Sequence, residues 1–133
     1  KQVATDIRML YKRLGKLHQQ ICADAEQFCE LAIKDQHRTR KRVKRLRYNI
    51  EFLQNLFPAK QVKNYLKALK PLQESLGQYN DLHVAESLYQ PYVKRKPKAW
   101  FVLGWLHAEQ QRLQKEIQAE LQQFAQVQPF WKK

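Results

Sequence analysis

Glycine, acidic residues and long apolar runs are all scarce in this sequence. Three glycines and five prolines in 133 residues leave few positions that would interrupt a helix. No apolar run is long enough to span a bilayer, and the chain carries no recognisable signal peptide. Glycine-rich phosphate loops are absent as well. We therefore expect no membrane-spanning helix, and no phosphate site built on a glycine-rich loop.

Cysteine is limited to Cys22 and Cys29, seven positions apart. On one helix their Cα atoms would be about 10 Å apart, which is too far for a disulfide. We interpret both as buried thiols in a reducing compartment and expect a cytoplasmic protein.

Patterns typical of catalytic or metal sites are also missing. The four histidines (His18, His37, His83 and His107) have neither HExxH nor CxxC spacing around them, and the acids form no acid–base pair. We expect no catalysis by this chain, no metal and no cofactor.

Apolar residues recur every three or four positions along almost the whole chain, which indicates amphipathic helices. The pattern predicts helices over residues 3–32, 37–57 and 60–76, a fourth that frays near Pro91, and a last one continuing to Val127. Strand-like alternation is absent. The fold class expected is an all-α antiparallel helical bundle, one domain over residues 1–133, with two long and about three shorter helices.

Local signals predict where these helices begin and end. Asp35 or Gln36 is expected to cap the second helix. Gly77 is expected to end the third, with Asn80 or Asp81 capping the fourth.

Bulky residues give two more expectations. Pro71 predicts a kink in the third helix. Trp100, Trp105 and Trp131 are expected to anchor the core.

Positive charge dominates the rest of the composition. Lys and Arg number 25 against 12 acids, a formal net charge of +13, and residues 37–47 hold seven of these cations and no acid. On a helix, one stripe carries His37, Lys41, Lys44 and Tyr48, with Arg40 and Arg47 beside it. This stretch spans about 15 Å, which suits a linear polyanion better than a single phosphate.

The cost of this clustering is also an argument for a ligand. Like charges one helical turn apart destabilise a helix by about 0.2–0.5 kcal/mol per pair, so seven such pairs cost roughly 1.5–3.5 kcal/mol. A bound polyanion would remove that cost. The alternative is a merely solvated face, and it applies most to Arg38, Arg42 and Arg45.

A second stripe at helical spacing holds Lys60, Lys63, Lys67 and Lys70. Solvation alone could explain it. If the second and third helices pack as an antiparallel hairpin, both stripes would border one groove. The basic loop 94–98 is a candidate third wall.

Two motifs resemble those of a known family. The first is His37-x-x-Arg40-x-x-x-Lys44-Arg45-Leu46-Arg47-Tyr48-x-x-Glu51, and the second is Leu72-Gln73-x-x-Leu76-Gly77-x-x-Asn80-Asp81. Together they resemble the signature of the CHAD domain, the conserved-histidine α-helical domain. Gly104-Trp105 and Pro129-Phe130-Trp131 are similar to its closing helix.

The resemblance implies a helical domain that binds inorganic polyphosphate, beside a triphosphatase domain called CYTH or on polyphosphate granules. The binding residues it implies are His37, Arg40, Lys44, Arg45 and Arg47. Helical geometry adds Lys41, Tyr48, Lys63, Lys67 and Lys70. It also makes Glu51 a partner that orients neighbouring cations, and the resemblance makes Asn80 and Asp81 structural.

Family members are usually about twice this length, with two similar halves, and this chain resembles the C-terminal half. It begins with Lys1 rather than Met, so we expect a fragment of a longer protein. A missing N-terminal half or a second chain would then complete the groove.

Two other functions fit the composition. Nucleic acid would be attracted by the same charges, although few side chains suited to base edges accompany them. A docking scaffold for a partner phosphatase would instead bind through an apolar patch.

Overall fold

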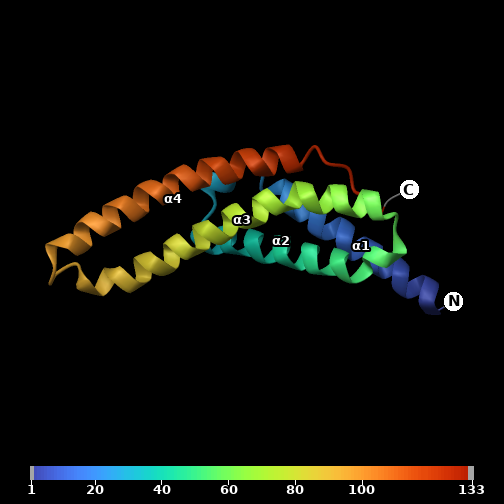
Figure 1. The fold of residues 1–133 in the computed structure, drawn as a ribbon, viewed down its shortest axis with the longest axis horizontal. Helices are drawn as coiled ribbons and strands as arrows, with labels where there is room; N and C mark the ends of the chain where they lie inside the picture. The colour runs from blue at the N-terminus through green and yellow to red at the C-terminus, as the bar shows by residue number, and fades with distance from the viewer. Residues whose placement is uncertain (1, 132–133) are drawn as a thin grey trace.

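Four α-helices pack as an antiparallel bundle in the computed structural model, which describes the backbone of residues 2–131 and the side chains of residues 4–131. They are α1 (Gln2–Ala23), α2 (Ile33–Leu53), α3 (Ala59–Tyr89) and α4 (Pro97–Phe124). Helices that follow one another in the chain lie side by side (Figure 1). No strand occurs within residues 2–131, so the all-α prediction is confirmed. No helix in this range is apolar over a sufficient length to cross a membrane.

The prediction of five helices is wrong, because the third and fourth expected helices form the single 31-residue helix α3. Gly77, Asn80 and Asp81 all lie inside α3 and cap nothing. A glycine that ends a helix usually adopts positive φ, and no glycine in the described part of the chain does so. Pro71 also lies inside α3, and the helix continues on both sides of it.

The boundary between the first two helices also differs from the prediction. α1 ends at Ala23, and α2 begins at Ile33 without any side-chain cap. Asp35 lies in the first turn of α2, where its carboxylate is 3.7 Å from Arg38. Gln36 is buried and bonds to the carbonyl of Phe28, so a tertiary contact uses the side chain expected to cap the helix.

The main core follows the predicted apolar periodicity. The predicted positions that are buried include Leu14, Ile21, Val43, Leu46, Ile50, Leu69, Leu72, Leu76, Ile117 and Leu121. Val3, expected on the same face, has its side chain outside the described residues. Trp131 folds back onto this core, with its ring centroid 5.3 Å from that of Tyr65, so its predicted role as an anchor is confirmed.

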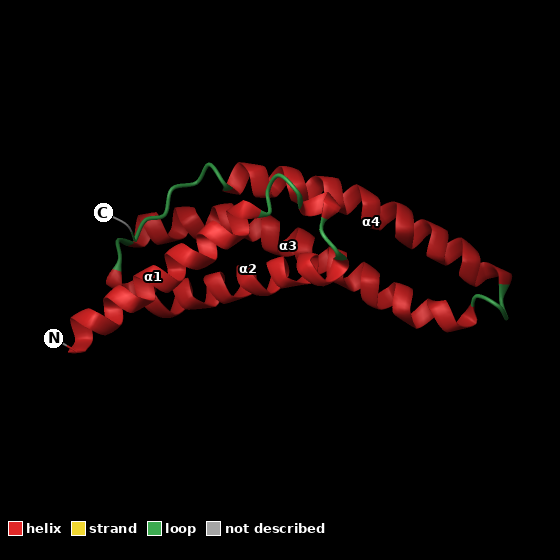
Figure 2. Cartoon of the chain, turned by 180° about the vertical axis from the view of Figure 1, so that it is seen from behind, coloured by secondary structure: helices red, strands yellow, loops and turns green. Residues whose placement is uncertain are grey.

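The hairpin of α3 and α4 extends beyond the ends of α1 and α2 as a two-helix arm (Figures 1 and 2). A small second core of Val93, Leu103 and Leu106 holds the arm together. Trp100 and Trp105 are 64% and 57% exposed, so their prediction as core anchors is wrong. In the arm, α3 and the turn that follows it pack against one side of α4, and apolar residues on its other sides stay uncovered.

The two cysteines are free thiols and are only half-buried, whereas full burial was expected. Cys29 lies in the short 3-10 turn Phe28–Glu30 rather than on the helix of Cys22. Burial raises the pKa of the Cys22 thiol.

Glu86 joins the two helices at the base of the arm. Its carboxylate lies 2.5 Å from His107 Nε2 and accepts a bond of 3.1 Å from Gln110 Nε2. The hydrogen bond to His107 is the main cause that lowers the pKa of Glu86, and Gln110 adds to it. A carboxyl with a lowered pKa stabilises the fold above its unfolded-state pKa, and this contribution is lost as the pH falls through the folded-state value.

We expect Glu86→Gln to lower the free energy of unfolding at pH 7, where the carboxylate is charged. The difference from wild type should shrink as the pH falls below about 4.3, the usual glutamate pKa, because both side chains are then neutral. Urea unfolding of both proteins at a series of pH values measures this difference in the free energy of unfolding. A difference that stays constant down to pH 3 would contradict a stabilising role for the charged Glu86 carboxylate.

We expect Gly77→Ala to stabilise the protein by about 0.5–1 kcal/mol, because alanine is the better residue inside a helix. A Cβ atom at this position would meet nothing within 4 Å. Gly104→Ala on α4, where a Cβ is equally unobstructed, is the matched control. Urea unfolding would show destabilisation instead if the helix ended at Gly77.

Candidate functional site

A groove runs between α2 and α3, and three adjoining cavities form it. The first, of about 410 Å³, is lined by Arg47, Glu51, Leu66, Lys67, Lys70, Gln73 and Glu74. The second, of about 120 Å³, is lined by Arg40, Val43, Lys44, Gln73, Leu76 and Gly77. The third, of about 370 Å³, is lined by Ile33, Lys34, Gln36, His37, Arg40, Leu76, Tyr79, Asn80 and His83. Because neighbouring cavities share lining residues, we treat them as one feature, the α2–α3 groove.

The rotation of α2 places its cations at this groove. Val43, Leu46 and Ile50 are fully buried, which fixes the inward face of the helix. Arg40 and Lys44 lie beside that face and are half-buried. Long basic side chains can pack their stems along apolar residues while their charged ends stay in water. Both cations are therefore positioned by the core and available to a ligand.

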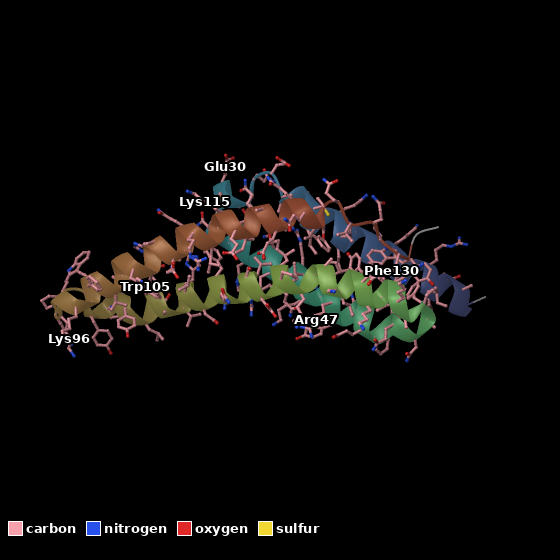
Figure 3. All side chains as sticks on the ribbon, turned by 45° about the horizontal axis from the view of Figure 1, so that its top comes forward. Glu30, Arg47, Lys96, Trp105, Lys115 and Phe130 are labelled. Atoms are coloured by element: carbon pink, nitrogen blue, oxygen red, sulfur yellow. The ribbon has the colours of Figure 1, made fainter. Side chains whose placement is uncertain are left out.

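Arg47 is held in place across the groove. Its Nε is 3.3 Å from the Glu51 carboxylate, and its Nη1 donates a 2.8 Å hydrogen bond to Gln73 Oε1 on α3. Figure 3 shows Arg47 where α2 and α3 run side by side. The contact with Glu51 matches the orienting role predicted for that acid. Within residues 4–131, neither Arg40 nor Lys44 has an ion pair.

The structure brings together six of the ten predicted site residues: His37, Arg40, Lys44, Arg47, Lys67 and Lys70. The other four do not line the α2–α3 groove. Lys41, Tyr48 and Lys63 are exposed beside it. Arg45 lines a separate cavity between α1 and α2, with Arg13 and Lys16. A binding role for these four stays a prediction.

Two cations of the basic run have structural partners. Arg38 lies 3.7 Å from Asp35, and Arg42 lies 3.9 Å from Asp24. Asp24 also accepts a 2.6 Å hydrogen bond from Thr39. The contacts of Arg42 and Thr39 with Asp24 tie α2 to the segment after α1. Arg38 is exposed, as the alternative of a solvated face would have it, whereas the half-buried Arg42 is more than a solvated surface charge.

The basic loop 94–98 does not form a third wall of the groove. It lies at the tip of the arm, where Figure 3 shows Lys96 far from Arg47.

Gln73, Asn80 and His83 line the groove without having been predicted to do so. They continue the spacing of Lys67 and Lys70 along α3. Gln73 already lay on the helix predicted over residues 60–76, whereas Asn80 and His83 lie beyond the break expected at Gly77, which concealed their place on the same face.

We expect Lys44→Gln to raise the free energy of unfolding at low ionic strength. Lys44 has three cationic neighbours one turn away, Arg40, Lys41 and Arg47, and relief of each repulsion is worth about 0.2–0.5 kcal/mol. The gain should shrink in high salt because salt screens these charges. Urea unfolding at low and at high salt measures this gain in the free energy of unfolding. Arg42→Gln is the control on the same helix and should not stabilise, because it breaks the contact with Asp24.

Residues 4–90 match the CHAD domain family. The match covers more than half of the chain and includes most of α1, all of α2 and α3, and both walls of the groove. No curated protein and no solved structure matches. The resemblance noted at Gly104-Trp105 and Pro129-Phe130-Trp131 lies beyond the matched residues and stays a prediction. The extent of the match shows that this chain belongs to the CHAD domain family.

Proposed function

We propose that the α2–α3 groove binds inorganic polyphosphate, and that this chain binds it without catalysing a reaction. The observation that carries the proposal is that cations line both walls of one groove, which Glu51 and Glu74 also line at one end. Arg40, Lys44 and Arg47 line it from α2, while Lys67 and Lys70 line it from α3. Cations on both walls can contact the two sides of one extended anion.

The length of the groove favours a chain over a single phosphate. His37 and Arg47 are ten positions apart on α2, or about 15 Å at helical rise. Charge-assisted hydrogen bonds from arginine and lysine to phosphate oxygens are short and strong. A linear polymer with a negative charge on every unit can form them along the whole run.

The lining of the cationic part of the groove favours phosphate over the bases of nucleic acid. The two cavities that contain Arg40, Lys44, Arg47, Lys67 and Lys70 have no aromatic lining residue. Binders of single strands usually stack bases on aromatic rings, and such rings are missing from this part of the groove. The charges alone would still attract nucleic acid at low salt.

The same proposal extends to partners and location. Membership of the CHAD family makes a CYTH-type triphosphatase domain, or a second CHAD half, the partner proposed for this chain. Polyphosphate granules in the cytoplasm are the location proposed for it. The exposed Trp100 and Trp105 provide an apolar surface with which such a partner could pack.

The first test is competition for labelled long-chain polyphosphate at about 0.15 M salt, where diffuse attraction is largely screened. Unlabelled polyphosphate should displace it at least tenfold better than duplex DNA or RNA at equal phosphate concentration. Equal displacement by nucleic acid would overturn the proposal in favour of a general polyanion binder.

A pair of charge-matched double variants tests the place of binding. Arg40→Gln with Lys44→Gln removes two groove cations and should weaken polyphosphate binding about tenfold or more, because direct charge-assisted bonds are lost. Lys41→Gln with Arg45→Gln removes the same charge from the same helix outside the groove and should weaken it much less. Equal losses in the two variants would show that total charge, rather than the groove, determines affinity.

A further inference from the structure

One end of the α2–α3 groove differs in chemistry from the rest. The cavity of about 370 Å³ at this end has walls formed mainly by Ile33, Leu76, Tyr79 and His83. Lys34, His37 and Arg40 also line it, and Arg40 does so where the cavity adjoins the cationic part. The groove therefore combines a cationic run with an apolar, partly aromatic end.

A phosphate chain alone does not use the apolar part of this end. Phosphate oxygens placed against Ile33 and Leu76 give up hydrogen bonds to water, and these side chains offer no replacement. An apolar group on the ligand would gain from the same walls. The volume lies within the range of about 300–1,000 Å³ that is typical of small-molecule sites.

Two polar groups could recognise a heterocycle in this cavity. The Nε2 atom of His83 is buried and has no hydrogen-bond partner within the described residues, while its Nδ1 lies 3.5 Å from Glu86. The side chain of Asn80 is a second lining group with both a donor and an acceptor. A few polar groups in an apolar pocket are the usual means of fixing a ligand's orientation.

The connection between the two parts of the groove identifies the class of ligand. Arg40 and Leu76 line both the apolar cavity and the neighbouring cavity that contains Lys44. A ligand with its ring against Tyr79 and Ile33 would thus place an attached phosphate chain at Arg40 and Lys44. We propose that the groove binds nucleoside polyphosphates, with the base in the apolar cavity and the phosphates along the cationic run. This inference rests on the proposed function for its phosphate half.

The test compares adenosine 5′-tetraphosphate with inorganic tetrapolyphosphate by calorimetry at about 0.15 M salt, where diffuse attraction is weak. The two have the same number of phosphates, and the inorganic compound carries at least as much charge, so electrostatics alone would favour it. We expect the adenosine compound to bind at least tenfold more tightly. Equal binding, or tighter binding of the inorganic compound, would overturn the inference and leave the proposed function standing. Failure of both compounds to bind would overturn the two together.

Ile33→Ser tests the place of the base. Ile33 is 60% exposed at the rim of the cavity, so its replacement should leave the fold intact. We expect affinity for the adenosine compound to fall to about that for tetrapolyphosphate, whose own binding should not change. Val84→Ser is the matched control, since Val84 is 52% exposed on α3 and does not line the cavity. Unchanged discrimination in Ile33→Ser would contradict the assignment of the base to this cavity.

Discussion

The hydrogen bond between Tyr79 and Gln36 fixes the arrangement on which the groove depends. The Tyr79 hydroxyl donates to Gln36 Oε1 over 2.6 Å, deep between α3 and α2. Gln36 Nε2 donates to the carbonyl of Phe28, and Gln114 on α4 donates to the Tyr79 hydroxyl. Loss of one member would leave buried polar groups unpaired, at about 1–3 kcal/mol each. Such directional contacts select one rotation of α2 against α3, which apolar packing alone specifies less sharply.

Once that rotation is set, the charges on α2 fall into two groups. Arg38 and Arg42 are near acids: Arg38 lies close to Asp35 on α2 itself, and Arg42 connects α2 with Asp24 after α1. Arg40 and Lys44 are directed to the groove and have no acidic partner within the described residues. Stability alone would favour acids beside them. Their repulsion is tolerated because the large apolar core contributes far more than the charges cost.

The sequence was sufficient to predict those features of the structure that depend on helical periodicity. It predicted the all-α fold, most buried positions and the basic face of α2. It failed at Gly77 and Asn80, because local signals for helix ends were overridden by packing of α3 along its full length. It also failed at Trp100 and Trp105, since periodicity identifies apolar residues but not where the covering helices stop.

The candidate site was predicted only in part, for a related reason. Arg40 and Arg45 look alike in sequence, and the packing of α1 and α3 on either side of α2 places them in different cavities. Their separation follows from tertiary structure rather than from spacing along α2 alone. The apolar end of the groove lies where residues from the beginning of α2 meet the middle of α3, so no single segment reveals it.

The unbroken course of α3 has a structural consequence. One helix of about 46 Å provides a wall of the groove at one end and half of the projecting arm at the other. Because α3 does not end at Gly77, the arm and this wall of the groove belong to one continuous helix. A protein bound to the arm would therefore contact the same helix that carries Lys70 and Gln73 in the groove.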